Sequence, residues 1–118
     1  MEEAKVTASA NATAKYIRVS PLKAKRVADL IRGKNLTEAL AILQITGNKP
    51  ARAFEKVVKS AAANATNNHG MNAQKLYVSE IWANEGPTMK RMRARSHGRG
   101  SVILKRSSHL SVVLKERV

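Results

Sequence analysis

The sequence contains no cysteine, few aromatic residues and few acidic residues, and these shortages exclude several classes of protein. Without cysteine, the chain can form no disulfide, thiolate zinc site or cysteine nucleophile. No run of about 18 apolar residues occurs, so we expect no membrane span. The start, Met1-Glu2-Glu3, lacks the pattern of a signal peptide, and these glutamates argue against a transit peptide. We therefore expect a cytoplasmic protein, and the 118 residues are the size of one typical domain.

Positive charge is abundant and unevenly placed. The chain has 22 Lys and Arg residues against 8 Asp and Glu residues, which gives a net charge of +14. Half of this excess lies in residues 86–106, which contain no acidic residue. So large a charge repels itself, which indicates a polyanionic partner. Because residues 86–106 are also poor in apolar side chains before Val102, they predict an arm that projects from a packed body.

Capping residues and apolar spacing predict three helices. Ser20-Pro21 begins the first helix, with the Ser20 hydroxyl on a free backbone N–H and Gly33 at the left-handed position after the helix end. Thr37 is expected to cap the second helix. From Pro50 onward, apolar residues follow helical spacing, and residues 67–70 are expected to end this third helix.

Three stretches are rich in β-branched, aromatic or alternating apolar residues and predict strands. One strand is expected within residues 4–19, another over 76–85 and another within 102–114. In residues 102–114, Leu110, Val112 and Leu114 recur at every second position, which is the period of a strand face. The sequence therefore predicts both helices and strands.

The basic stretch connects two of the predicted strands. We expect residues 80–106 to form an extended hairpin that reaches about 40 Å, at roughly 3.3 Å per residue. The single domain 1–118 would then consist of a body, residues 1–85 and 107–118, and this hairpin. An isolated hairpin is marginally stable in water, so its shape would come from the partner that it binds.

The residue types of enzyme active sites are present but scattered. Asp29 lies in a predicted helix beside basic residues, where an ion pair is the more ordinary role. His69, His97 and His109 are too widely spaced for a metal site or a catalytic triad. In Ser107-Ser108-His109, adjacent side chains on a strand point to opposite faces. We expect no catalysis, no metal and no cofactor, and an RNA-processing enzyme remains one alternative.

The arm has the composition of an RNA-binding element. Its cations from residue 91 to residue 99 are all arginine, whose planar guanidinium binds phosphate through paired hydrogen bonds and stacks on bases. Zinc fingers, basic zippers and the aromatic platform of RNA-recognition domains are absent from the sequence. This favours binding of a folded RNA by shape and phosphate contacts. A free basic chaperone or regulator without a fixed site is the other alternative.

Several stretches, in order and spacing, resemble the bacterial family of large-subunit ribosomal protein twenty-two. They are residues 16–21, Lys23, 26–34, 60–64 with Asn68, 84–91, 98–99 and 105–113. The resemblance implies an α+β fold, a three-stranded antiparallel sheet packed on three helices, with a long protruding basic β-hairpin. It also implies a structural constituent of the large ribosomal subunit that binds the large rRNA, supports assembly and lines the nascent-peptide exit tunnel. The implied partners are rRNA, neighbouring large-subunit proteins and the nascent peptide in transit, and no homo-oligomer is expected.

The resemblance also assigns roles to individual residues. The implied rRNA-binding residues are Arg18, Lys23, Arg26, Lys90, Arg91, Arg93, Arg95, Arg99, Lys105 and Arg106. The implied tunnel-lining tip consists of Arg95, His97, Gly98 and Arg99. The sequence departs from the family pattern in three places. No proline precedes the tip, Leu22 stands where arginine is common, and Gly100-Ser101 replaces a more usual Ala-Asp, which makes the tip more basic.

Overall fold

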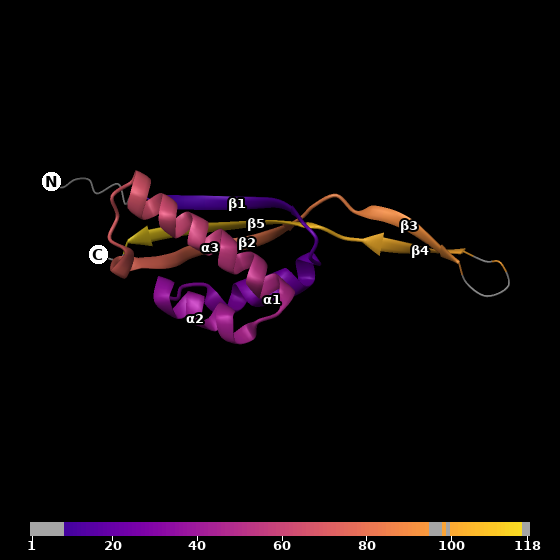
Figure 1. The fold of residues 1–118 in the computed structure, drawn as a ribbon, viewed down its shortest axis with the longest axis horizontal. Helices are drawn as coiled ribbons and strands as arrows, with labels where there is room; N and C mark the ends of the chain where they lie inside the picture. Colours follow the sequence, from indigo (N-terminus) through magenta and orange to yellow (C-terminus); the bar gives the residue numbers. More distant parts are fainter. Residues whose placement is uncertain (1–8, 95–97, 99, 117–118) are drawn as a thin grey trace.

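The structure is a computed structural model that describes residues 9–94, 98 and 100–116. An antiparallel sheet in the order β1-β5-β2 carries three helices on one face, and a ribbon of two antiparallel strands, β3 and β4, extends beyond it (Figure 1). The molecule is long and narrow, with extents of 73 × 27 × 21 Å. The elements are β1 (Ser9–Ile17), α1 (Pro21–Ile31), α2 (Leu36–Thr46), α3 (Lys49–Asn68), the 3₁₀ turn η1 (Ala73–Lys75), β2 (Leu76–Glu85), β3 (Met89–Ala94), β4 (Gly100–Lys105) and β5 (Ser108–Glu116).

The hydrophobic core lies between the sheet and the helices. On β5, Leu110, Val112 and Leu114 are fully buried, because alternate residues of a strand point to the same face. α3 packs on β1 and β5, and its Phe54 and Ala61 are fully buried. The predicted α+β fold and the predicted apolar faces of the third helix and the last strand are confirmed.

The three predicted helices are confirmed, with two corrections at their starts. Ser20 is the N-cap residue of α1, but its hydroxyl makes no capping hydrogen bond, and Ser20 lines a groove of the body instead. α2 begins earlier than predicted: Asn35 is its N-cap residue, and Thr37 lies inside the first turn. The reason is that Asn35 pairs with Tyr77 as an isolated β-bridge, which fixes an extended backbone directly before the helix.

The basic stretch contains the two-stranded ribbon. β3 pairs with β4 from Met89 opposite Lys105 to Ala94 opposite Gly100. Residues 102–114 contain parts of two strands, since β4 ends at Lys105 and β5 begins at Ser108. Between β3 and β4, Gly98 has a φ of 72°, the left-handed conformation that glycine adopts without strain. The other predicted tip residues, Arg95, His97 and Arg99, lie outside the described residues.

Close backbone contacts join the ribbon to the body. Gly86 N donates to Ser107 O at 2.9 Å, and Ser107 Oγ donates to Pro87 O at 2.6 Å. A Cβ on Gly86 would lie 2.7 Å from Ser107 Oγ, so any larger residue here would have to push the Ser107 side chain aside. The fully buried Ser108 Oγ donates to Val19 O at 2.6 Å. These contacts fix the base of the ribbon and the turn between β1 and α1 relative to each other.

Candidate nucleic-acid interface

A groove of about 670 Å³ opens on the body between α1 and the connection from α2 to α3. We call it the basic groove, because four cations from three segments line it. Arg18 comes from the turn after β1, Lys23 and Arg26 from α1, and Lys49 from the start of α3. Lys23 and Arg26 are three residues apart, so α1 presents them on one side. The other lining residues are Val19, Ser20, Val27, Leu30, Thr46, Asn48 and Pro50.

The basic groove combines apolar side chains with uncompensated positive charge. Val27 and Pro50 are buried, and Leu30 remains 48% exposed. Its lining contains no acidic residue, and no described carboxylate lies within 4 Å of its four cations. Such a surface attracts a ligand that is both anionic and partly apolar, which is the chemistry of a nucleotide.

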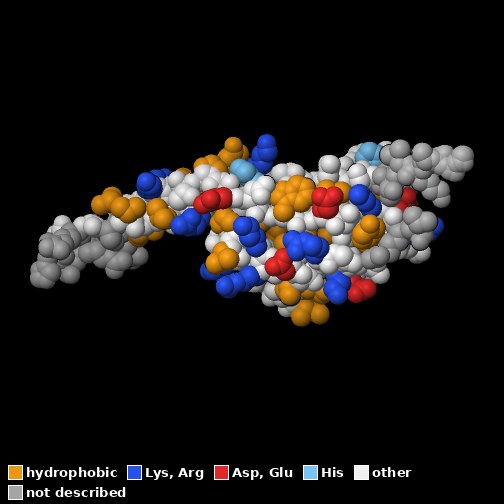
Figure 2. Space-filling model, turned by 180° about the vertical axis from the view of Figure 1, so that it is seen from behind, with side chains coloured by type: hydrophobic (Ala, Val, Ile, Leu, Met, Phe, Trp, Pro, Cys, Tyr) orange, Lys and Arg blue, Asp and Glu red, His pale blue; other side chains and the backbone are white. Residues whose placement is uncertain are grey.

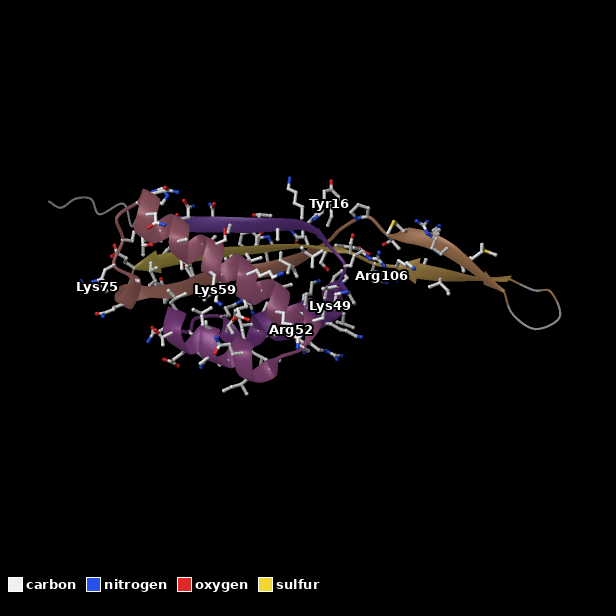
Figure 3. All side chains as sticks on the ribbon, viewed as in Figure 1. Tyr16, Lys49, Arg52, Lys59, Lys75 and Arg106 are labelled. Atoms are coloured by element: carbon white, nitrogen blue, oxygen red, sulfur yellow. The ribbon has the colours of Figure 1, made fainter. Side chains whose placement is uncertain are left out.

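The start of α3 brings a fourth cation, Lys49, to the groove, and the sequence alone did not predict it there. Asn48 is the N-cap residue of α3, and its Oδ1 accepts from Ala51 N at 2.9 Å. Pro50 follows in the first turn, so the helix begins with Lys49 exposed beside the groove (Figure 3). The sequence did contain a sign of this helix start, because Asn48 is a typical capping residue and stands two positions before Pro50.

The ribbon offers both cations and apolar side chains. Residues paired across an antiparallel ribbon share a face, so its two faces follow from the register. One face carries Met89, Arg91, Ile103 and Lys105, and the other carries Lys90, Met92, Val102 and Leu104. Met92 is 71% exposed and Val102 is 57% exposed, and Figure 2 shows hydrophobic and basic side chains together along this part of the molecule. The ribbon can therefore contact phosphates and bases at the same time.

Some cations of the arm already have partners in the protein. Arg106 Nη1 lies 3.2 Å from Glu85 Oε2 at the base of the ribbon (Figure 3). Arg91 Nη1 donates to Lys90 O at 3.0 Å. The ion pair of Arg106 is exposed and therefore weak, so a phosphate can compete for its guanidinium. Lys90 and Lys105 have no acidic partner among the described residues.

The predicted rRNA-binding residues fall into two groups in the structure. The three body residues, Arg18, Lys23 and Arg26, meet in the basic groove. The described arm residues lie along the ribbon and at its base: Lys90, Arg91 and Arg93 on β3, Lys105 at the end of β4, and Arg106 directly after it. Arg95 and Arg99 lie outside the described residues.

The serine and histidine residues considered for catalysis have structural partners. The hydroxyls of Ser107 and Ser108 donate to the backbone carbonyls of Pro87 and Val19. His109 Nδ1 accepts from the backbone N–H of Tyr16 at 3.1 Å. The sequence Ser-Ser-His therefore does not form a pair of nucleophile and base.

The remaining titratable candidates also have ordinary surroundings. Asp29 Oδ1 lies 2.5 Å from Arg32 Nη1, as the ion-pair interpretation predicts, and His69 is exposed at the C-terminal end of α3. Within the described part of the chain, no group of three or more metal-ligating side chains could hold an ion. No helix there is both long enough and apolar enough to cross a membrane.

The fold and the two cationic surfaces define a basic α+β protein with the charge distribution of a polyanion-binding protein. A model of the family described as ribosomal protein L22p/L17e matches residues 12–115. The chain belongs to this family, which confirms the resemblance seen in the sequence. The family is a structural component of the large ribosomal subunit and not an enzyme.

The chain is also similar to individual relatives from three bacteria, each of which is named large ribosomal subunit protein uL22. The chain is 58% identical to the relative from Clostridioides difficile over 108 residues, which cover 92% of this chain and 97% of the relative. It is 56% identical over 110 residues to that of Mycoplasmopsis agalactiae, with 93% and 96% covered. It is 55% identical over 108 residues to that of Halothermothrix orenii, with 92% and 96% covered.

Proposed function

We propose that this large-subunit ribosomal protein binds the large rRNA through two surfaces, the basic groove and the ribbon. The observation that carries this proposal is the convergence of Arg18, Lys23, Arg26 and Lys49 on one groove of about 670 Å³ without an acidic residue in its lining. Such a concentration of like charge opposes folding unless a polyanion neutralises it. The apolar side chains between the cations suit the face of a base or a ribose.

The ribbon extends this contact away from the body. We assign rRNA contacts to the described cations Lys90, Arg91, Arg93, Lys105 and Arg106, and we extend the assignment to Arg95 and Arg99. The exposed apolar side chains of Met92 and Val102 support close contact with RNA, because in an arm surrounded only by water they would stay in unfavourable contact with solvent. In this proposal residues 80–106 act as the arm and residues 1–85 with 107–118 as the docking body.

The end of the ribbon is assigned to the wall of the nascent-peptide exit tunnel. Arg95, His97, Gly98 and Arg99 would face the peptide in transit, and the glycines at 98 and 100 would let the backbone there approach a crowded surface closely. The body would contact neighbouring large-subunit proteins and act as a single copy. Because one chain would contact RNA with the body and with the arm, it would hold separate RNA segments together and so support subunit assembly.

The direct test is the amount of this chain in purified large subunits that have been washed in high salt. The proposal predicts one copy per subunit by quantitative mass spectrometry. Loss of the chain under conditions that retain the other subunit proteins would instead favour a free basic regulator. A separate incubation of labelled rRNA with the protein and a divalent metal is expected to leave the RNA intact.

A further inference from the structure

A second groove, of about 410 Å³, lies between β1 and α3 and has a different chemistry. We call it the amide groove. Its lining residues are Asn11, Ala12, Thr13, Ser60, Ala63, Asn64, Asn67 and Asn68. None of them carries a charge, and most carry an amide or a hydroxyl. Residues 60–64 and Asn68 belong to the family resemblance, yet the proposed phosphate contacts make no use of them.

A hydrogen-bond network fixes part of the groove and leaves the rest available. Asn68 Nδ2 donates to Asn64 Oδ1 at 2.5 Å, and Asn64 Nδ2 donates to the backbone oxygen of Asn11 at 3.3 Å. These two bonds set the orientation of the Asn64 amide. The side chains of Ser60 and Asn67 have no hydrogen-bonding partner among the described residues, so their donors and acceptors face a ligand or water.

The same network disfavours a protein strand as the occupant. β1 is an edge strand of the sheet, and its open edge could in principle accept another strand. The amide of Asn64, however, already occupies the carbonyl of Asn11 at that edge. A carbonyl oxygen can accept two hydrogen bonds, but an added strand would have to pass the Asn64 side chain to reach this one, so the groove is better suited to a ligand that hydrogen-bonds to side chains.

The surface of α3 continues from the amide groove into a basic region. Arg52 and Lys56 are exposed and lie eight and four residues before Ser60, so helical spacing places all three on one side of α3. Lys59 is paired with Glu55 at 3.1 Å, whereas Arg52 and Lys56 have no acidic partner among the described residues (Figure 3). Lys56 and Asn64 are about 12 Å apart along the helix, at roughly 1.5 Å per residue.

We propose that the amide groove binds the ribose edge of a helical RNA segment, with Asn67 and Ser60 hydrogen-bonded to 2′-hydroxyls while Arg52 and Lys56 hold a neighbouring phosphate. A 2′-hydroxyl both donates and accepts, as an amide or a hydroxyl side chain does, and it carries no charge that would require a cation. The wide minor groove of A-form RNA displays these hydroxyls beside phosphates. This inference rests on the proposed rRNA binding and adds a contact that distinguishes RNA from DNA.

The test uses the full chain and a large-subunit rRNA transcript that carries randomly placed 2′-deoxynucleotides. Bound and unbound transcripts are separated and sequenced, first with the unaltered protein and then with Asn67→Ala. The matched control is Gln74→Ala, which removes an exposed amide outside the amide groove. We expect Asn67→Ala to weaken binding about two- to tenfold, the range of a lost hydrogen bond. It should leave the salt dependence unchanged, because the uncharged Asn67 neutralises no phosphate.

The decisive result is a set of positions at which a 2′-deoxynucleotide weakens binding of the unaltered protein and of Gln74→Ala but not of Asn67→Ala. Equal interference in all three proteins would overturn the inference and leave the proposed rRNA binding intact. Unchanged rRNA affinity with weaker retention on assembled subunits would assign the groove to a protein neighbour and also overturn it. Failure of every protein to bind the transcript would overturn the proposed function itself, and the inference with it.

Discussion

The backbone N–H of Tyr16 donates to His109 Nδ1 at 3.1 Å, and the two rings stand at right angles with their centroids 4.9 Å apart. Tyr16 has a φ of 60°, a left-handed conformation that is costly for a bulky residue. The register of β1 with β5 shifts between Ala14 and Ile17, at this same point. His109 therefore holds the strained end of β1 in place beside the base of the ribbon.

Replacing His109 by alanine is expected to lower the free energy of unfolding by about 1–2 kcal/mol, because it removes both the acceptor for Tyr16 N–H and the ring contact. Chemical denaturation of the free protein measures this change. His69→Ala is the matched control, since His69 is exposed at the end of α3. Equal stabilities of the two variants would show that the Tyr16–His109 contact contributes nothing.

The crossing from β2 to β3 is the second structural prediction. Gly86→Ala would place a Cβ 2.7 Å from Ser107 Oγ and 3.3 Å from His109 Cε1. We expect a loss of about 1–3 kcal/mol, the usual range for overpacking. Adding Ser107→Ala removes the closest contact and should recover part of the loss. A double variant no more stable than the sum of the two single losses predicts would contradict this explanation.

Much of the body could be predicted from the sequence because its signals are local. The spacing of Phe54, Val57, Val58 and Ala61 predicts α3, and the residue types of 76–85 predict β2 with its observed bounds. The predicted start of α2 was wrong because Asn35, and not Thr37, caps the helix. Asn35 is held there by its β-bridge to Tyr77, a contact between segments distant in sequence. Thr37 satisfies the local capping rule equally well, so local reasoning could not choose between them.

The site was predictable in part, for the same reason. Arg18, Lys23 and Arg26 are close in sequence to one helix start, but Lys49 joins them only through the packing of α3 beside α1. The amide groove requires β1 and α3 to meet, and no sequence spacing connects Asn11 with Asn64. Charge density marks the arm in the sequence, whereas a neutral groove gives no comparable signal.

The basic groove makes a quantitative prediction about rRNA binding. The double variant Lys23→Gln and Arg26→Gln should weaken binding and lower the slope of log affinity against log salt by about 0.7–0.9 for each phosphate that is no longer neutralised. Lys75→Gln is the control, because Lys75 is exposed and does not line the basic groove (Figure 3). If the double variant keeps the slope of the unaltered protein, the groove does not bind phosphate.

Glu55 provides a pH prediction on α3. A hydrogen bond from Lys59 lowers the pKa of the Glu55 carboxyl below its ordinary value of 4.5, with a smaller contribution from Gln44. A carboxyl with a lowered pKa in the folded state stabilises the fold above the pKa of the unfolded state, and this contribution disappears as the pH falls through the folded pKa. Lys59→Met should therefore raise the pKa of Glu55, which NMR titration of its side chain would detect. No change in that pKa would assign the shift to another cause.

If the ribbon binds rRNA phosphates, removing its cations must change the salt dependence of rRNA binding. The full chain with Lys90, Lys105 and Arg91 changed to glutamine is compared with a control in which Lys34, Lys75 and Lys115 are changed. Far-UV circular dichroism should show unchanged helix content in both proteins. We predict that the ribbon variant binds more weakly and that its salt slope falls by about 2, at roughly 0.7 per neutralised phosphate, while the control stays close to the unaltered protein. An unchanged slope in the ribbon variant would show that these three cations neutralise no rRNA phosphate, and that the ribbon is not the phosphate-binding element proposed here.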